Sequence, residues 1–294
     1  MAIGLTRNIM ATKKQQTNIH NRFPKTTNIL AKEENGNSFS RRLFVMRHGE
    51  RCDFTFGKTW MRKCFDEDGI YKQTDLNLPK TMIKRQPITD YSKDSPLTEL
   101  GMFQARATGD AFRKADVDIK NIYVSPSLRC VQTAQNVIEG LDNNAKMCIE
   151  PSAFEWFGWY KNAMPHWLTA DQLSEQGFNI NVKHKPFVQI KDLHLDETVT
   201  DYYERCHRLA EHILKKHEEE GGDILIVAHA GSLDTFTRQL RGRNPRTSQE
   251  MHHILASFTY CCLCCLAQDE KSGSWCLSDP PIPTLGEFDW KVLL

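Results

Sequence analysis

ILIVAHAG, at residues 224–231, is the clearest strand signal in the chain, because four large apolar residues run directly into a polar turn. RLFVMRHG, at residues 42–49, repeats this pattern. A short, unbroken apolar run that ends at a turn is typical of a strand buried on both faces. Such strands belong to parallel sheets that helices cover on both sides. The two stretches therefore predict the interior of an α/β fold.

Helical periodicity separates the strand signals. Residues 122–124 predict a strand followed by a helix from 125 through 137, and residues 198–220 predict a helix that ends at two glycines. This alternation predicts a mostly parallel sheet with helices on both faces. Ligands bind at the carboxyl ends of the strands in such sheets. Residues 47–49 and 229–231 can therefore meet at one site.

A further helix is predicted after Thr98, whose side chain can cap its first turn. Four apolar residues then recur on roughly one helical face: Leu100, Phe103, Ala107 and Phe112. We expect this face to pack against the core.

The composition predicts one folded domain behind a flexible arm. Of 294 residues, 40% are apolar and 26% are charged, which is the balance of a globular protein. The 38 basic and 37 acidic residues leave a net charge of +1, so nothing favours nucleic acid or an anionic membrane as a partner. Residues 1–40 are basic and rich in Asn and Thr. We expect a disordered arm there, with a mitochondrial presequence as the alternative, and a domain over 41–294.

The chain is predicted to be cytoplasmic. No apolar run reaches the roughly 18–20 residues of a membrane-spanning helix, and the first segment lacks the apolar core of a secretory signal. We interpret the ten cysteines as reduced thiols. CCLCC at 261–265 could form a zinc site with His252 and His253, but strand alternation favours buried structural thiols. Cys52, beside Arg51, is expected to be a partly exposed thiol.

Residues 52–95 show no sustained periodicity, and long excursions of this kind usually carry function. We expect the segment to flank the active site. Its aromatic residues could line an entry for a bulky apolar group, or they could pack the loop onto the domain. These residues are Phe54, Phe56, Trp60, Phe65 and Tyr71.

RHGER, at residues 47–51, combines an imidazole with two guanidinium groups directly after a predicted strand. A guanidinium matches the geometry of phosphate oxygens and stays charged. A neutral imidazole nitrogen can attack phosphorus. The glycine at position 49 allows another backbone to approach closely. The combination indicates phosphoryl transfer.

Several motifs resemble those of the histidine phosphatase superfamily, which has the phosphoglycerate mutase-like fold. They are RHGER at 47–51, SPSLR at 125–129 with QTA at 132–134, and VAHAGS at 227–232. LTELG at 97–101, FEW at 154–156 with WY at 159–160, and LSDPP at 277–281 are similar to one branch. That branch contains ecdysteroid-phosphate phosphatase and the phosphatase domain of the suppressor of T-cell-receptor signalling proteins. The resemblance spans about residues 42–294.

The resemblance implies a role for each polar residue of these motifs. His48 would be the nucleophile that becomes a phosphohistidine, and Glu155 would be the proton donor and acceptor. The phosphoryl oxygens would be bound by Arg47, Arg51 and Arg129, with His229 as a further donor. No metal and no other cofactor is expected. The resemblance also implies a possible homodimer.

These expectations predict a histidine-type phosphatase that hydrolyses a phosphomonoester. The aromatic residues favour a bulky apolar or aromatic leaving group, as in a phosphotyrosine protein or a steroid phosphate. Two alternatives stay open. The chain could be a phosphoglycerate-type mutase, which returns the phosphoryl group to a sugar acid, or a weakly active domain that serves as an adaptor.

Overall fold

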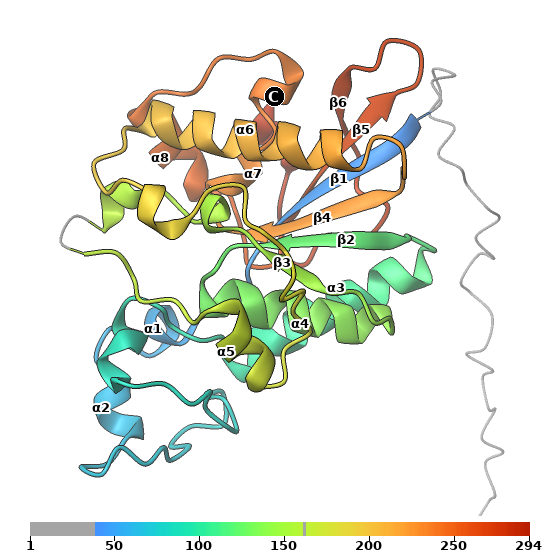
Figure 1. The fold of residues 1–294 in the computed structure, drawn as a ribbon. Coiled ribbons are helices and arrows are strands. Elements are labelled where there is room, and N and C mark those ends of the chain that lie inside the picture. Colours follow the sequence, from blue (N-terminus) through green and yellow to red (C-terminus); the bar gives the residue numbers. More distant parts are fainter. Residues whose placement is uncertain (1–38, 161–162) are drawn as a thin grey trace, which may run out of the picture. The chain divides into compact units, whose positions relative to one another are not determined.

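A six-stranded mixed sheet forms the centre of the computed structural model, which describes residues 39–160 and 163–294 (Figure 1). The strand order is β3-β2-β4-β1-β5-β6. Most of the predicted arm, residues 1–38, lies outside the described residues. The strands are β1 (Phe39–Arg47), β2 (Ile119–Val124), β3 (Met147–Ile149), β4 (Asp223–Ala228), β5 (Leu263–Asp269) and β6 (Trp275–Ser278).

Four consecutive strands of the sheet, from the edge strand β3 to β1, are parallel, in agreement with the predicted mostly parallel sheet. β4 pairs in parallel with β1 on one side and with β2 on the other, and β2 pairs in parallel with β3. β5 and β6 add antiparallel pairings at the other edge. Because β1, β2 and β4 are neighbours and run the same way, the residues after each of them emerge at one edge of the sheet.

Eight α-helices and six short 3₁₀ helices connect the strands of the described residues. Thr98 and Thr198 cap two of the long helices, each with its hydroxyl accepting from a backbone N–H three residues later. The α-helices are α1 (Cys52–Thr55), α2 (Met61–Cys64), α3 (Glu99–Lys114), α4 (Leu128–Leu141), α5 (Ala170–Glu175), α6 (Val199–Lys216), α7 (Ser232–Thr235) and α8 (Ser248–Leu255). The 3₁₀ helices are η1 (Ile88–Ser92), η2 (Pro151–Ala153), η3 (Phe157–Trp159), η4 (Ile190–Asp192), η5 (Gln239–Arg241) and η6 (Trp290–Leu293).

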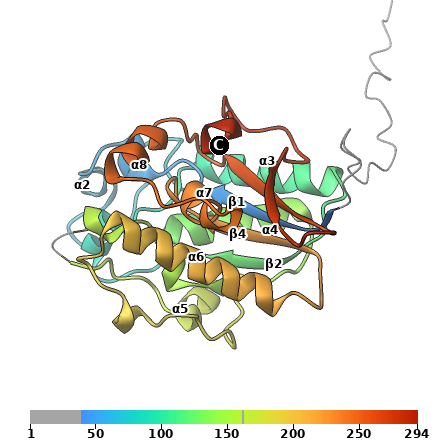
Figure 2. The ribbon, with the colours of Figure 1, turned by 90° about the horizontal axis from the view of Figure 1, so that it is seen from above.

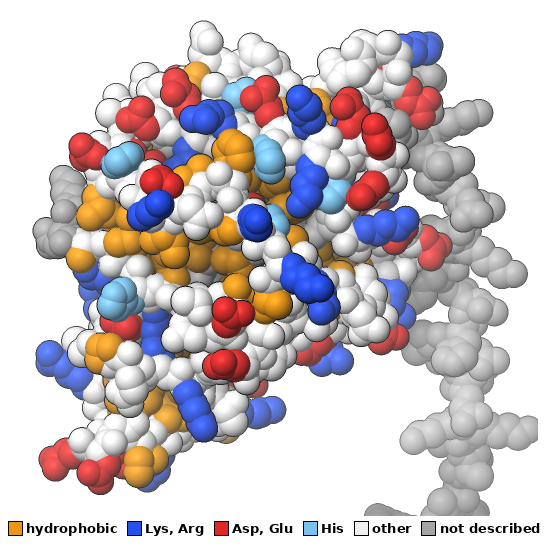
Figure 3. All heavy atoms as spheres, viewed as in Figure 1, with side chains coloured by type: hydrophobic (Ala, Val, Ile, Leu, Met, Phe, Trp, Pro, Cys, Tyr) orange, Lys and Arg blue, Asp and Glu red, His pale blue; other side chains and the backbone are white. Residues whose placement is uncertain are grey.

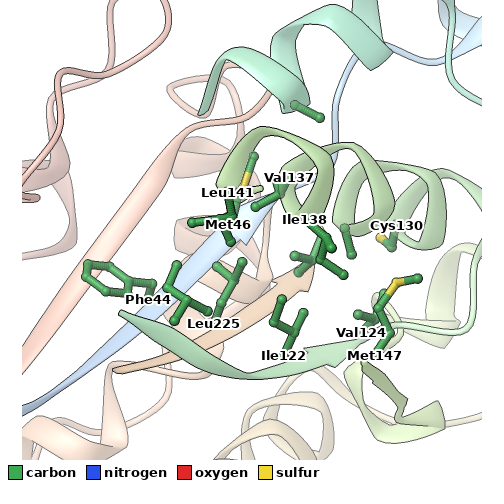
Figure 4. Packing of buried hydrophobic residues seen from close by; sticks show 14 of the residues in the cluster. Phe44, Met46, Ile122, Val124, Cys130, Val137, Ile138, Leu141, Met147 and Leu225 are labelled. Atoms are coloured by element: carbon green, nitrogen blue, oxygen red, sulfur yellow. The ribbon is translucent and has the colours of Figure 1, made fainter. Parts of the chain in front are cut away.

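Hydrophobic clusters cover both faces of the sheet, as its alternating side chains require. On one face, Phe44 and Met46 of β1 meet α3 and α4 (Figure 4). On the other face, Leu43 and Val45 of the same strand meet α6. Figure 1 shows these helices on opposite sides of the sheet, and Figure 2 shows α2 and α8 beyond the end at which β1 terminates.

The buried face of α3 differs from the sequence prediction. Leu100 and Phe103 are 45% and 67% exposed, whereas the buried face includes Gly101, Gly109 and Phe112. These inward-facing positions need glycine because neighbouring backbone comes too close for a side chain. A Cβ on Gly109 would lie 2.1 Å from the carbonyl oxygen of Val137 in α4. Ordinary apolar periodicity misses a face that is built from glycine.

The segment 52–95 packs onto the domain through a small hydrophobic cluster that includes Leu128 of α4. Trp60, Phe65, Tyr71 and Tyr91 pack together around α2, with ring centroids 5.4–6.4 Å apart. For these aromatic residues the prediction of an open entry is wrong, and the alternative of local packing is correct. Phe54, which is 65% exposed, is the aromatic residue of this segment that faces solvent.

The cysteines at 261, 262, 264 and 265 are buried, as predicted, whereas Cys148 is half-buried and Cys276 is exposed. Cys261 and Cys265 lie in the cluster beneath α3 and α4, while Cys262 and Cys264 lie in a cluster on the opposite face. The prediction for Cys52 is wrong: its side chain is fully buried, and its Sγ donates to the carbonyl oxygen of Leu97 at 3.3 Å. Burial raises the pKa of the Cys52 thiol.

The described residues contain neither a helix that could span a membrane nor a group of side chains that could hold a metal ion. No helix in residues 39–160 and 163–294 is long and apolar enough to cross a bilayer. Within the same ranges, no group of three or more His, Cys, Asp or Glu side chains is arranged to hold a metal ion. Figure 3 shows Lys and Arg side chains interspersed with Asp and Glu over one face, in keeping with the net charge of +1.

Candidate active site

Two imidazoles meet where β1 and β4 end. His48 follows β1 directly and His229 follows β4 directly, and the two ring centroids are 5.6 Å apart at an interplanar angle of 71°. Both side chains are almost fully buried. The two polar turns that the sequence placed at strand ends therefore converge, although most of the chain separates them.

A hydrogen bond determines which nitrogen of His48 is free. Its Nδ1 lies 2.8 Å from the carbonyl oxygen of Gly49. A carbonyl oxygen can only accept, so Nδ1 carries the proton and Nε2 keeps its lone pair. In this tautomer Nε2 of His48 can act as a nucleophile.

Close backbone contacts hold the segment that carries His48. A Cβ on Gly49 would lie 2.5 Å from the carbonyl oxygen of Gly101, at the start of α3. The N–H of Gly49 donates to the hydroxyl of Thr133 in α4 at 3.0 Å, and the N–H of Cys261 donates to the carbonyl oxygen of His48 at 3.2 Å. Two helices and the loop before β5 therefore fix the position of the imidazole.

The loop before β5 also orients Arg47. The Arg47 guanidinium donates to the carbonyl oxygen of Phe258 and lies 4.4 Å from the ring centroid of Tyr260. The same tyrosine ring is 6.0 Å from the ring of His48. Tyr260 therefore forms an aromatic wall beside the two residues.

Arg129 enters the site from the first turn of α4. One of its nitrogens, Nη2, donates to Glu155 Oε1 at 2.5 Å and to His229 Nδ1 at 3.1 Å. The side chain is fully buried, yet its Nε and Nη1 have no acceptor among the described residues. A buried cation with free N–H donors is costly unless an anion completes its hydrogen bonds.

The surroundings of His229 fix its tautomer in this structure. Nδ1 accepts from Arg129, since a guanidinium has donors only. Nε2 therefore carries the proton and donates to the hydroxyl of Ser125 at 2.8 Å. Ser125 directly follows β2, so the ends of three adjacent strands contribute to the site.

Arg51 is paired in a way that the sequence analysis did not anticipate. Its guanidinium makes a bidentate contact with Asp53, at 2.6 and 2.7 Å, and lies 4.3 Å from the ring centroid of Phe54. Arg51 still acts on the site electrostatically, because its charge helps to lower the pKa of both histidines.

The electrostatics of the site keep both imidazoles neutral. Burial is the main reason that the pKa values of His48 and His229 lie well below the usual value, and the charges of Arg129, Arg47 and Arg51 lower them further. Burial also lowers the pKa of Arg47. The site is thus a group of guanidinium side chains around two uncharged rings.

Sequence reasoning missed four polar or aromatic neighbours of this site. Ser125 and Asp53 could have been found, because Ser125 directly follows a strand and Asp53 lies two residues after the RHGER motif. Tyr160 belongs to the WY motif at 159–160, but that motif does not indicate its contact with Glu155, and Tyr260 lies in no motif. Each reaches the site through an irregular segment whose path the sequence does not disclose. Tyr160 donates from its hydroxyl to Glu155 Oε1 at 2.6 Å.

A family model for the histidine phosphatase superfamily (branch 1) matches residues 79–275. The chain belongs to the histidine phosphatase superfamily. This membership confirms the resemblance drawn from the motifs. It also agrees with the position of those motifs at the ends of β1, β2 and β4.

The relatives of this histidine phosphatase superfamily member include proteins with named substrates or domains. The chain is 40% identical over 264 residues to ecdysteroid-phosphate phosphatase of Drosophila melanogaster, covering 86% of this chain and 34% of that protein. It is 38% identical over 263 residues to ubiquitin-associated and SH3 domain-containing protein B of Mus musculus, covering 86% and 41%. The chain therefore spans about a third to two fifths of these relatives.

A solved structure supports the same fold assignment. The crystal structure of the ecdysone phosphate phosphatase of Bombyx mori in complex with tungstate matches with a TM-score of 0.70 and 32% identity. The match covers 86% of this chain and all of that one. The predicted fold class, a mostly parallel α/β sheet of the phosphoglycerate mutase-like type, is confirmed.

Proposed function

We propose that the chain hydrolyses phosphomonoesters through a phosphohistidine at His48. One observation carries the proposal: the free, buried N–H donors of Arg129 lie among further guanidinium groups and beside two neutral imidazoles. A phosphoryl group supplies the negative oxygens that such donors require. The unprotonated Nε2 of His48 supplies the lone pair for attack on phosphorus.

The reaction proceeds in two balanced steps. In the first, Nε2 of His48 forms a bond to phosphorus as the ester P–O bond breaks, and Glu155 gives its proton to the leaving oxygen. In the second, Glu155 takes a proton from water, whose oxygen attacks phosphorus as the P–N bond breaks. The products are an alcohol or phenol and inorganic phosphate, and both side chains return to their starting forms.

Cationic side chains stabilise the charge that spreads over the phosphoryl oxygens. The proposed ligands are Arg47, Arg51 and Arg129, with His229 as a further donor. In this structure Nδ1 of His229 accepts from Arg129, so it has no proton to donate. A bound anion favours the protonated ring, and Nδ1 of His229 can then donate to the phosphoryl group. Arg51 can share the N–H donors of its guanidinium group between Asp53 and the substrate.

The leaving group in this proposal is bulky and apolar or aromatic. Tyr260 beside His48 and the exposed Phe54 beside Arg51 offer flat apolar surfaces at the site. The names of the relatives point to steroid phosphates, and the superfamily branch recognised in the sequence points to phosphotyrosine. Both substrates present a ring next to the phosphate.

The decisive experiment compares the wild-type chain with His48→Ala on p-nitrophenyl phosphate. We expect the variant to lose nearly all turnover, because no other group in the site forms the covalent intermediate. His253→Ala, in the exposed part of α8, is the matched control and should keep full activity. Acid-labile phosphate on the wild-type protein, absent from His48→Ala, identifies the phosphohistidine. Equal turnover by His48→Ala and wild type would contradict the proposal.

The same experiment separates the alternative functions. A mutase would transfer the phosphoryl group to an added sugar acid rather than to water, and an adaptor would show equal background turnover with and without His48. A panel of steroid phosphates, phosphotyrosine peptides and sugar-acid phosphates then ranks the leaving groups. The aromatic surfaces predict higher kcat/KM for the first two classes.

The proposal also covers the bounds of the domain, its oligomeric state and its location in the cell. Residues 41–294 constitute the phosphatase domain, and Phe39 and Ser40 precede them at the start of β1. Deletion of residues 1–38 should leave activity unchanged. The domain forms a homodimer, which light scattering of the purified chain tests directly. It acts in the cytoplasm, which fractionation of cells that express the full chain tests.

A further inference from the structure

The two oxygens of the Glu155 carboxylate have different partners. Oε1 accepts from Arg129 Nη2 at 2.5 Å and from the Tyr160 hydroxyl at 2.6 Å. Oε2 accepts no hydrogen bond from the described residues, and His229 Nδ1 lies 3.8 Å from it, beyond hydrogen-bond distance. Two donors therefore occupy Oε1, and Oε2 is the oxygen left to carry an exchangeable proton.

Packing holds Tyr160 in the orientation that reaches Glu155. Its ring lies 5.1 Å from that of Phe154, and its backbone N–H donates to the carbonyl oxygen of Phe157 at 2.7 Å. Burial and the neighbouring Glu155 carboxylate raise the pKa of Tyr160. The phenol therefore stays protonated and acts as a donor to Oε1.

Arg129 and Tyr160 differ in what else they must do. In the proposed function Arg129 also binds phosphoryl oxygens, so its hold on Glu155 is shared with the substrate. The hydroxyl of Tyr160 donates only to Glu155. Tyr160 is thus the contact that can keep the carboxyl group in place when Arg129 turns toward a phosphate.

We propose that Tyr160 is a positioning residue that holds Glu155 by Oε1 and presents Oε2 to the leaving-group oxygen. The inference rests on the proposed function, since it assigns Tyr160 to the proton-donation step. It predicts a dependence on the leaving group: a poor leaving group needs the proton in the transition state, whereas a nitrophenolate leaves well without it.

The test compares Tyr160→Phe with wild type on phenethyl phosphate and on p-nitrophenyl phosphate. The parameter is kcat/KM, which reports the steps through phosphoryl transfer to His48. We expect kcat/KM to fall by about tenfold or more for phenethyl phosphate and by less than about threefold for p-nitrophenyl phosphate. Tyr71→Phe is the matched control, because that hydroxyl donates to the carbonyl oxygen of Pro79 in the segment around α2 and should leave both values unchanged.

A second variant shows whether Tyr160 acts through Glu155. In a Glu155→Gln background, adding Tyr160→Phe should have no leaving-group-dependent effect, because the carboxyl that Tyr160 positions is gone. Equal loss for both substrates, or no loss for either, would overturn the inference while leaving the proposed phosphatase intact. Inactivity of wild type toward both substrates would instead remove the proposed function and this inference with it.

Discussion

Arg129 combines three properties that a lysine cannot supply together. Its guanidinium donates to Glu155 and to His229 through one nitrogen, and the N–H donors of its other two buried nitrogens, Nε and Nη1, stay free for a phosphoryl oxygen. A lysine keeps the charge but has a single nitrogen at the end of a flexible chain. Geometry rather than charge therefore makes this position sensitive to substitution.

Arg129→Lys should lower kcat/KM for p-nitrophenyl phosphate by about 10²–10³-fold, the usual cost of losing one preorganised donor to transition-state charge. The retained charge limits the effect on folding. Arg106→Lys in α3 is the control, because Arg106 is exposed and pairs with Glu139 at 3.2 Å away from the site. Steady-state kinetics of both variants test the prediction, and a loss of less than about threefold in Arg129→Lys would contradict it.

At the scale of elements, two glycines of α3 have different neighbours. Gly101 faces the backbone next to the nucleophile, and a Cβ there would lie 2.2 Å from the carbonyl oxygen of Glu50. Gly109 faces α4, where a Cβ would lie 2.1 Å from the carbonyl oxygen of Val137. One helix therefore sets both the distance to α4 and the position of the His48 segment.

Gly101→Ala and Gly109→Ala should both destabilise the fold by about 1–3 kcal/mol, because overpacking outweighs the roughly 1 kcal/mol gained in helix propensity. Their effects on catalysis should differ. Gly101→Ala displaces the backbone of Gly49 and Glu50 and should also reduce kcat, whereas Gly109→Ala should keep kcat near wild type at temperatures where it is folded. Thermal unfolding and kinetics check both variants. Equal kcat in the two would contradict the role assigned to Gly101.

The elements also show how far the sequence determines this fold. Apolar runs at 42–46 and 224–227 predicted β1 and β4, and the polar residues after them placed His48 and His229 at one edge. The face of α3 could not be predicted, since a glycine face has no apolar periodicity. The packing of residues 52–95 and the approach of Tyr160 depend on irregular backbone, which has no period to detect.

At the scale of the whole folded unit, one long segment closes the open edge of the sheet. β3 is an edge strand, and the chain after α5 returns to cover it. The N–H of Met147 donates to the carbonyl oxygen of Asn179, and the N–H of Asn181 donates to that of Met147. Ile180 belongs to the cluster beneath α4, whereas Phe187 packs against the cluster beneath α6. The segment therefore links the two cores around the edge.

A buried ion pair stabilises this connection between the two hydrophobic cores. His184 Nε2 lies 2.7 Å from Oε1 of Glu150, which directly follows β3 and is fully buried. Burial opposes the charged form of His184, but hydrogen bonds with Cys148 and Glu150 outweigh it and raise the pKa to about 9. The backbone N–H of Phe187 also donates to Glu150. Breaking the pair leaves a buried carboxylate with fewer partners.

The pair should make stability depend on pH. The folded-state pKa of His184 exceeds its usual value of 6.5, so its contribution is fully present below pH 6.5 and is lost as the pH rises through about 9. His184→Gln should therefore lower the free energy of unfolding by on the order of 1–3 kcal/mol at about pH 6, and by much less at about pH 10. Urea unfolding at both pH values measures this difference. His253→Gln, on the exposed surface of α8, should match wild type at both. A His184→Gln deficit that does not change with pH would show that the ring acts as a neutral hydrogen-bonding group, and the charge of His184 would then have no part in closing the sheet edge.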